Sequence, residues 1–439
     1  YQLSKDVPYS LNRSFDQKTG YRTKSILAIP LANKQKEVIG VLQFINRKKA
    51  RSLKVSDEKS AFAYTLPFDS DINVLLQALA SQAGIAIENT VLQNDIKALF
   101  EGFVNASVSA IEQRDPTTSG HSFRVADLCV DLVASVSASN LTRMRNVHFT
   151  DSEVRELKYA ALLHDFGKVG VRESVLVKEK KLTAGSLENI QYRIWLAQEK
   201  LRTIALRKQL EMYRSGNAVE SEMHIINAEA EADIKLLNEF FATIVEANEP
   251  SILKEDNKEM LDKISGYNFE ALDNDLQIIT EDEFNLLSIK KGSLSPSERK
   301  EIESHVVHTQ SFLNHIPWTK EFQNVPTIAG AHHEKLDGSG YPYGMTADQI
   351  PLPSKIMTVC DIFDALTAPD RPYKPAMGLD RALDILRIES KQGYLDNDLV
   401  QIFIDAKVYK CIESKVYSST NSATGTSNHP CAHDLHEHS

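Results

Sequence analysis

From Asp71 to Gln113 the chain contains no proline, and its apolar residues recur every three or four positions. This spacing predicts one continuous α-helix. A helix of about 40 residues would be ~60 Å long, which is more than one small domain can bury. The positions that follow the spacing are Ile72, Leu75, Leu79, Gln82, Ala86, Asn89, Gln93, Ile96, Phe100 and Phe103. They form an imperfect heptad seam, which favours pairing with a second copy in a parallel dimer. The alternative is a helix packed between the chain's own two domains.

The composition indicates an ordinary globular chain. Its 439 residues are enough for two or three domains, each with its own core. The net charge of −10 argues against a binder of nucleic-acid polymers, which would carry a basic surface, but it leaves room for a small anionic ligand. The four cysteines form no CxxC pair, so neither a disulfide framework nor a thiolate zinc site is indicated. No apolar run approaches the ~18 residues of a membrane span, and no signal peptide is visible. We therefore expect a cytoplasmic location.

The residues before the long helix are typical of β-structure. Lys24–Leu31 and Glu37–Arg47 are apolar, β-branched runs joined by the polar residues NKQK, which predicts an antiparallel hairpin. With the following helical phrase LASQAGIAIENT, these runs resemble the latter part of a GAF domain, a small-molecule sensory fold. The resemblance implies a partial α+β sensory domain over residues 1–70, whose first half lies outside this sequence. Residues 71–113 would then be its terminal, signalling helix.

The histidines carry a chemical signal where they cluster. Four phrases contain such histidines and a fifth contains paired aspartates: GHSFRVA (His121), LLHDFGKVG (His164, Asp165, Lys168), ESHVVHT (His305, His308), AHHEKLDGSGYP (His332, His333) and TVCDIFDALT (Asp361, Asp364). The adjacent His164 and Asp165 offer one borderline and one hard ligand, a combination suited to bridging two divalent ions. Imidazole and carboxylate together favour iron, manganese, nickel or zinc over magnesium or calcium. Because no thiolate belongs to the set, a structural zinc site is not indicated.

Each phrase has an ordinary explanation when it is taken alone. An HD dipeptide occurs by chance, and Asp364 can cap a helix or pair locally. His305 and His308 lie one helical turn apart, so that both could face a site, but one of them can equally be a surface residue. Five such phrases in one order are much harder to explain by chance.

In this order the phrases resemble the HD-GYP family, the phosphodiesterases of bacterial cyclic dinucleotides. The resemblance covers about residues 110–190 and 286–409, with GHS, HDxGK, the histidine of the next helix, HHE…DGxGYP and D…DALT…DRPYK in sequence. It implies an all-α helical bundle over residues 114–418. The chain as a whole is then multidomain, with an α+β GAF-like part, a long connecting helix and an HD-GYP bundle that carries a helical insertion.

The resemblance also implies a role for individual residues. The metal ligands it implies are His121, His164, Asp165, His305, His332, His333 and Asp361. The substrate contacts it implies are Lys168, Gly340, Tyr341, Pro342, Arg371 and Lys374. Asp165 and Lys168 are the catalytic residues in this interpretation, because the lysine matches the one that reaches the reacting phosphate. His308 is left as a structural residue.

These roles together imply a metal-dependent hydrolase. Two divalent ions, iron or manganese with nickel or zinc as alternatives, would activate a hydroxide for attack on a phosphodiester. Lysines would stabilise charge on the phosphoryl oxygens. The function implied is hydrolysis of cyclic di-GMP to pGpG, or on to GMP, under regulation by the GAF module. The alternatives are a catalytically weak receptor that binds cyclic dinucleotide or a protein partner, and a phosphodiesterase for 3',3'-cyclic GMP-AMP.

About a hundred residues, near 183–293, depart from the short family pattern. Two amphipathic stretches in this insertion, Leu187–Met212 and Ile225–Val245, predict an antiparallel helical hairpin. Dimer contact, docking of a protein partner and regulation are all open as its role. The tail, 419–439, is poor in apolar residues and is expected to be disordered.

The number of metal ions depends on the residue one helical turn before His121, which is Thr117. Family members with glutamate at this position have a carboxylate that can recruit a third ion, whereas threonine offers only a neutral hydroxyl. Asp115 lies off that helix face, and its place before Pro116 suggests a helix cap. We therefore expect two ions. Fewer metal charges on the substrate also favour pGpG as the final product.

Overall fold

The computed structural model describes residues 14–115, 119–139, 141–217, 219–271, 274–368, 377–413 and 415. The chain divides into two compact units, Tyr1–Phe103 and Val104–Ser439, and each is described here by itself. No helix in the described ranges combines the length and the apolar character that crossing a bilayer requires.

The first unit contains the predicted hairpin. Strand β1 (Ile26–Ala32) pairs antiparallel with β2 (Val38–Ile45), from Ile26 opposite Ile45 to Ala32 opposite Val38, with an irregularity near the turn. Ile29 and Leu31 pack against Ala80 of the following helix. A Cβ atom on Gly84 of that helix would lie 2.9 Å from the Ala32 carbonyl oxygen, so the close approach of the strand requires glycine. The hairpin is thus confirmed, while its assignment to a GAF domain stays a proposal.

Four short elements complete the described part of this unit. They are α1 (Ser14–Thr19), β3 (Arg47–Lys48), α2 (Glu58–Tyr64) and β4 (Thr65–Leu66). Strand β3 pairs antiparallel with β4, and Asp57 closes a capping box at the start of α2.

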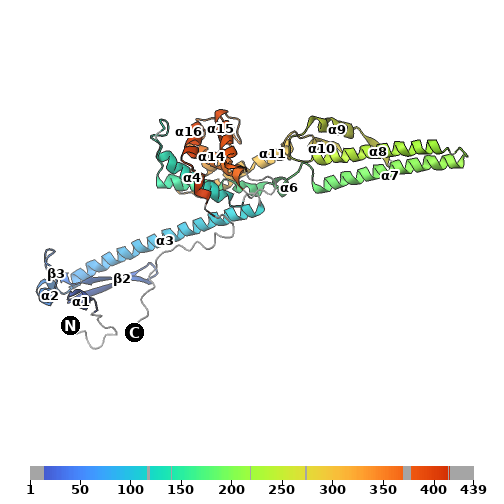
Figure 1. The fold of residues 1–439 in the computed structure, drawn as a ribbon. Helices are drawn as coiled ribbons and strands as arrows, with labels where there is room; N and C mark the ends of the chain where they lie inside the picture. The colour runs from blue at the N-terminus through green and yellow to red at the C-terminus, as the bar shows by residue number, and fades with distance from the viewer. Residues whose placement is uncertain are drawn as a thin grey trace. The chain divides into compact units, whose positions relative to one another are not determined.

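The predicted long helix is α3, which runs without a break from Ser70 to Arg114 (Figure 1). Its outer surface carries exposed apolar side chains with four–three–four spacing. These are Leu92, Ile96, Leu99 and Phe103, which are 51%, 68%, 76% and 45% exposed. Ile96 and Phe103 belong to the seam expected from the sequence, whereas Leu92 and Leu99 do not. Such spacing is the pattern of a coiled-coil seam.

The second unit is built around an α-helical bundle, as the sequence predicts. Its central elements are α4 (His121–Ser137), α5 (Asp151–Leu163), the 3-10 helix η2 (Phe166–Gly170), α12 (His305–Asn314), α13 (Val325–Gly330) and α14 (Leu352–Thr367). The flanking helices are α6 (Glu173–Leu176), α11 (Pro296–Glu303), α15 (Leu379–Lys391), α16 (Asn397–Asp405) and α17 (Lys410–Glu413). Helix α4 packs against α5 and α14, and α12 packs against η2 and α13.

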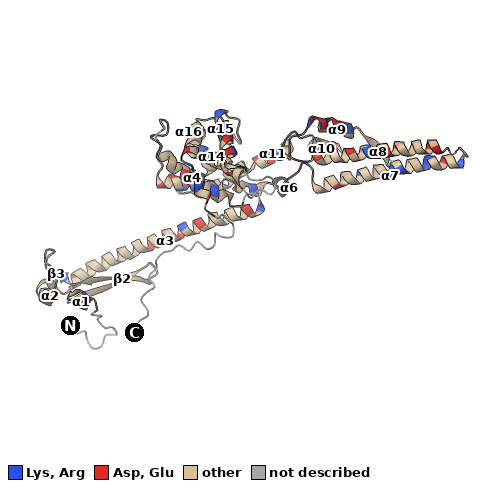
Figure 2. Cartoon of the chain, viewed as in Figure 1, with Lys and Arg blue, Asp and Glu red and all other residues tan. Residues whose placement is uncertain are grey.

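The insertion forms the predicted antiparallel hairpin and several further elements. Helices α7 (Ala184–Arg214) and α8 (Glu220–Ala247) pack along each other. They are followed by α9 (Glu255–Ser265), the two-stranded sheet of β5 (Asn268–Ala271) and β6 (Asn274–Gln277), and α10 (Glu281–Leu287). Charged residues occur along both long helices (Figure 2). These further elements were not foreseen from the sequence, because only the two long stretches carry a clear helical period.

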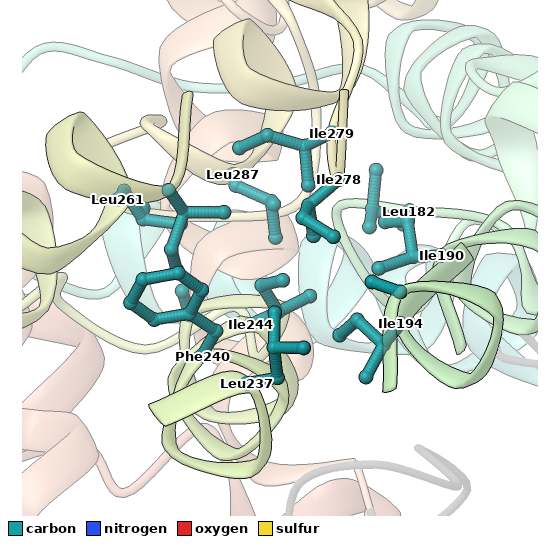
Figure 3. Packing of buried hydrophobic residues seen from close by; sticks show 13 residues of the cluster. Leu182, Ile190, Ile194, Leu237, Phe240, Ile244, Leu261, Ile278, Ile279 and Leu287 are labelled. Atoms are coloured by element: carbon teal, nitrogen blue, oxygen red, sulfur yellow. The ribbon is translucent and has the colours of Figure 1, made fainter. Parts of the chain in front are cut away.

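The insertion has its own hydrophobic core, which explains how it can extend from the bundle. Ile190 and Ile194 of α7 meet Leu237, Phe240 and Ile244 of α8 (Figure 3). Residues of α9, α10 and the segment between them close this core, namely Leu261, Ile278, Ile279 and Leu287.

The two ends of the insertion meet at its base through polar contacts. Lys178 pairs with Glu298 at 2.7 Å, and the Ser293 hydroxyl donates to the Lys178 carbonyl at 2.9 Å. The fully buried Lys181 donates from Nζ to the Leu287 carbonyl at 2.9 Å. Burial lowers the pKa of this lysine.

Two leucine substitutions test the separate core of the insertion. Leu237→Ala should lower the free energy of unfolding of this region by about 2–5 kcal/mol, because the side chain is fully buried and its loss leaves a cavity. Leu206→Ala is the matched control, since this leucine of α7 is 65% exposed and its truncation should cost well under about 1 kcal/mol. Local stability can be followed by native-state hydrogen exchange. Equal effects of the two substitutions would contradict a packed core between α7 and α8.

Candidate metal centre

Five separate parts of the bundle supply the imidazoles and carboxylates that the sequence singles out. His121 is the first residue of α4, and Asp361 lies on α14. His164 and Asp165 directly follow α5. His305 begins α12, and His332 and His333 follow α13. The structure brings all seven side chains together, although they are spread over 241 positions of the chain, from 121 to 361.

The seven side chains form overlapping groups that could each hold an ion. One group is His305, His332 and His333, and another is His121, His164 and Asp361; within each group the candidate ligand atoms lie within 4.8 Å of one another. A further group joins His164, Asp165 and His332. One oxygen of Asp165 lies 3.3 Å from His305 Nε2, and its other oxygen lies 3.6 Å from His164 Nε2. Asp165 therefore stands between the two main groups, as a bridging carboxylate would.

Hydrogen bonds on the far side of each ring turn the Nε2 atoms toward the centre. Three Nδ1 atoms lie within hydrogen-bond distance of the carbonyl three residues earlier: His164 at 2.7 Å from Ala161, His305 at 2.6 Å from Ile302, and His332 at 2.6 Å from Ala329. A carbonyl can only accept, so Nδ1 must carry the proton and Nε2 has a free lone pair. This is the usual arrangement of metal-binding histidines.

Two of these lone pairs have no hydrogen-bond partner in the described part of the chain. They belong to the buried Nε2 atoms of His305 and His332. Burial of a polar atom without a hydrogen-bond partner costs free energy. A buried acceptor of this kind therefore indicates a position where a ligand binds. A divalent cation would satisfy both atoms, so the residues present fit a metal ion.

Asp364 holds His121 in the same way that the carbonyls hold the other rings. Its Oδ2 atom lies 2.7 Å from His121 Nδ1, and its Oδ1 atom accepts from Arg124 Nε at 2.7 Å. His121 Nε2 is left 3.2 Å from Asp361 Oδ1 and 3.3 Å from His164 Nε2. The sequence interpretation left Asp364 as a residue that can cap a helix or pair locally, and it assigned Arg124 no role. The GHSFRVA spacing, which places Arg124 one turn after His121, is the only signal that could have linked them.

The protonation states differ between the two histidine groups. Burial lowers the pKa of His332 well below its ordinary value and that of His333 to about 4, and burial also lowers the pKa of His305. These imidazoles are therefore neutral near pH 7. Burial disfavours charge on His121 as well, but hydrogen bonds to Asp361 and Asp364 outweigh it and raise the pKa of His121 to about 10.

Lys168 lies at the edge of the cluster, between two carboxylates. Its Nζ atom is 2.9 Å from Asp165 Oδ2 and 2.9 Å from Asp115 Oδ2. Burial alone would lower the pKa of Lys168, but these two carboxylates raise it, so the ammonium form is kept. Asp115 was read from the sequence as a helix cap. Its carboxylate instead contacts Lys168, because the end of α3 lies against η2, as the contact of Arg114 with the Val169 carbonyl also shows.

The 3-10 helix η2 lies very close to α12. A Cβ atom on Gly167 would be 1.9 Å from the His305 carbonyl oxygen, so no other residue fits there. Gly167 N–H donates to Thr309 Oγ1 at 2.8 Å, and this hydroxyl donates to the His164 carbonyl at 2.9 Å. Thr309 is fully buried, and its two hydrogen bonds fix the segment from His164 to Val171, called the HD segment here, to α12. Its role was missed because a single threonine in a helix carries no sequence signal.

The glycine-rich loop after His333 lies beside the cluster. The Tyr341 ring is 4.8 Å from the His333 ring, centroid to centroid, and burial raises the pKa of the tyrosine. Gly340 permits this approach, since a Cβ atom there would be 2.3 Å from the Lys335 nitrogen. Pro342 follows in the same loop.

The buried carboxylate of Glu334 holds the next part of this loop. It accepts from the Tyr343 N–H at 2.7 Å and from the Met345 N–H at 2.9 Å. The HHE motif thus contributes a residue that shapes the loop in addition to two candidate ligands.

Some of the residues expected from the sequence lie outside the described ranges. These are Arg371, Lys374, Thr117 and the tail 419–439. The roles of the two cations and the count of two ions stay predictions. His308 is exposed and borders Gly170, away from the candidate ligand groups.

Metal binding should depend on pH differently at the two groups. An ion at His305, His332 and His333 meets neutral rings, whereas an ion at His121 must displace a proton whose pKa is about 10. Titration with Mn²⁺ should find two equivalents. The first should have nearly constant affinity between about pH 6 and 8, and the second should gain about tenfold per pH unit. Calorimetry in buffers of different ionisation enthalpy should detect release of one proton. An identical pH dependence for both equivalents would contradict the assignment.

Comparison with known proteins finds HD domains in the part of the chain that carries the cluster. Two family models, each described as an HD domain, match residues 118–243 and 282–399. A protein of Vibrio cholerae named 3'3'-cGAMP-specific phosphodiesterase 3 is 43% identical over 102 residues, which is 23% of this chain and 21% of that protein. A cyclic di-GMP phosphodiesterase of Pseudomonas aeruginosa is 41% identical over 75 residues, 17% of each chain. A cyclic di-GMP phosphodiesterase response regulator of Xanthomonas campestris is 52% identical over 59 residues, 13% of this chain and 15% of that protein.

The matched region is therefore less than a third of each of these relatives. A solved structure described as Bd1817, a HDG"Y"P protein from Bdellovibrio bacteriovorus, aligns with 63% of this chain and 76% of its own, at 13% identity and a TM-score of 0.22, which is too low to bear on the fold. The two family matches and the named relatives together support an HD-superfamily protein of the HD-GYP type.

Proposed function

We propose that this chain is a metal-dependent phosphodiesterase that hydrolyses cyclic di-GMP, with pGpG as the main product. The observation that carries the proposal is the convergence of the seven imidazole and carboxylate side chains, with Lys168 and Tyr341 at the rim of the cluster. The names of the similar proteins support the same class of reaction.

The chain's own residues divide the work between holding ions and holding substrate. His305, His332 and His333 would hold one ion, His121, His164 and Asp361 the other, and Asp165 would bridge them. Bound ions would supply a Lewis acid for the phosphoryl oxygens and a water of lowered pKa. The Lys168 ammonium, kept charged by Asp115 and Asp165, would stabilise negative charge on the phosphoryl oxygens. Tyr341 would orient the ligand from the loop side, and Arg371 and Lys374 would bind its phosphate or guanine.

The donor set bears on the identity of the ions. Imidazole nitrogen and carboxylate oxygen without thiolate are typical of iron and manganese sites, with nickel and zinc as alternatives. Magnesium and calcium are less suited to this site, because they prefer oxygen ligands over imidazole nitrogen.

A second candidate substrate is 3',3'-cyclic GMP-AMP. It is favoured by the identity of 43% to a protein named as specific for that compound. The phosphodiester is the same in both ligands, so the metal cluster does not distinguish them. The alternative that is not an enzyme is a receptor that binds a cyclic dinucleotide or a protein partner without hydrolysing it.

Product analysis tests the function directly. Protein loaded with Mn²⁺ or Fe²⁺ should convert cyclic di-GMP to pGpG, with GMP as a minor later product, as resolved by chromatography. Asp165→Ala and His332→Ala should each lower turnover by more than about 100-fold, because even outer partners of metal ligands contribute about 10–100-fold. Tyr341→Ala should mainly raise KM and leave the metal content unchanged. Binding without any turnover would favour the receptor, and faster hydrolysis of cyclic GMP-AMP would favour the second substrate.

We further propose a cytoplasmic homodimer that pairs through α3 and is regulated by a GAF-type first unit. The exposed residues Leu92, Ile96, Leu99 and Phe103 support the pairing, because their spacing suits the seam of a parallel coiled coil. The role of the insertion as a docking surface for a protein partner belongs to the same proposal.

Charge placed in this seam should separate the dimer. Leu99→Glu should convert a dimer into a monomer in light scattering, since two buried glutamates would face each other. Val91→Glu is the matched control, because Val91 is 51% exposed on the same helix but lies off the seam, so it should leave the dimer intact. If Leu99→Glu is still a dimer, the contact lies elsewhere in the chain.

A further inference from the structure

The end of α3 contacts the HD segment at three points. Arg114 donates from Nη1 to the Val169 carbonyl and from Nη2 to the Val171 carbonyl, the latter at 2.8 Å. The next residue, Asp115, accepts from Lys168 Nζ at 2.9 Å. Two neighbouring residues at one helix end therefore hold both the backbone at the end of η2 and the side chain of the η2 lysine.

The pair of Asp115 and Lys168 is largely removed from solvent. The two side chains are 5% and 15% exposed, so their attraction is screened much less than that of a surface pair. A lysine side chain has four rotatable bonds and loses considerable freedom when its ammonium is fixed. Asp165, the other carboxylate at Lys168, belongs to the candidate ligand set and would share its charge with an ion. Asp115 lies outside that set, so its contact with the lysine does not compete with the binding of an ion.

Asp115 is tied to the helix that precedes it. Its backbone N–H donates to the Ile111 carbonyl at 3.0 Å, which continues the hydrogen-bond pattern of α3 by one residue. Helix α3 is continuous from Ser70, so a rotation or a shift along its axis would displace Arg114 and Asp115 together. In the same movement the carbonyls of Val169 and Val171 would lose Arg114, and the ammonium of Lys168 would lose Asp115 and keep only Asp165.

We propose that Asp115 is a positioning residue for Lys168, and that Arg114 and Asp115 together link α3 to the catalytic lysine. Asp115 keeps the ammonium where it meets the phosphoryl oxygens, and Arg114 keeps the segment behind it in place. The orientation of α3 then sets the activity of the site. The inference rests on the proposed function, because it assigns Lys168 to the substrate phosphate.

A double-mutant cycle distinguishes positioning from a merely structural ion pair. Asp115→Asn should lower kcat about 10–100-fold, which is the range for partners that orient active groups. KM should change much less, and the content of bound Mn²⁺ should stay that of the wild type. In a Lys168→Met background, Asp115→Asn should have no further effect, because the group through which it acts is gone. Asp115→Glu, which keeps the charge, should recover part of the activity.

Three results of the cycle would overturn the positioning role. Asp115→Asn could have the kcat of the wild type, or its effect could be as large without Lys168 as with it. It could also lose bound Mn²⁺, which would make Asp115 part of the metal site. Failure of the proposed function is a separate result, namely a wild-type chain that binds Mn²⁺ but hydrolyses no cyclic dinucleotide.

Hydrogen exchange tests the link to α3 without any substrate. Arg114→Met should speed the exchange of the amides of 166–171, because two carbonyl contacts of this segment are lost, and it should lower kcat as well. Gln113→Met is the matched control, since the neighbouring Gln113 is exposed and should leave both unchanged. Unchanged exchange in Arg114→Met would overturn the link.

Discussion

The structure of the site depends on hydrogen bonds from imidazole rings to the ends of helices. His164, His305 and His332 each follow the end of a helix, and each Nδ1 atom meets the carbonyl three residues earlier. Helix ends leave carbonyls without an intrahelical partner, so these positions supply acceptors at no cost to the helix. The rings are oriented by this local geometry, and three helix ends then direct their Nε2 atoms to one place. His121 is instead the first residue of a helix, α4. There the carboxylate of Asp364, and not a carbonyl three residues earlier, contacts the Nδ1 atom.

The close packing of η2 beneath α12 follows from the same requirement. Asp165 lies 3.3 Å from His305 Nε2, and the chain after it passes so close to the His305 carbonyl that position 167 requires glycine. Thr309 of α12 joins the two segments, because its hydroxyl accepts from Gly167 N–H and donates to the His164 carbonyl on the segment that leads into η2. Lys168 is then carried to the edge of the cluster, where the end of α3 meets it. The position of the lysine thus also depends on α3, a helix that contributes no candidate ligand itself.

The insertion leaves this arrangement intact because it folds on its own core. Its chain leaves the bundle after Lys178 and returns before Glu298, and these two residues pair at the base. The buried residues of α7 to α10 contact one another, so the bundle does not need to supply apolar surface for them. This explains why the ligand phrases on either side of about a hundred added residues still meet.

Periodicity and short motifs determined a large part of this protein without a structure. A proline-free run with helical spacing was enough for α3, and two β-branched runs with a polar turn were enough for the hairpin. The clustered phrases suggested metal by their residue types, and their resemblance to the HD-GYP family then implied which seven residues are the candidate ligands. The sequence did not predict contacts between residues that lie far apart in the chain. Asp364 on His121, Thr309 on Gly167 and Asp115 on Lys168 are pairs separated by 243, 142 and 53 positions. Aspartate and threonine have many local uses, as caps, turns and surface groups. Only the packing of the helices, which places one particular carboxylate or hydroxyl within 3 Å of one particular donor, decided which use each of them has.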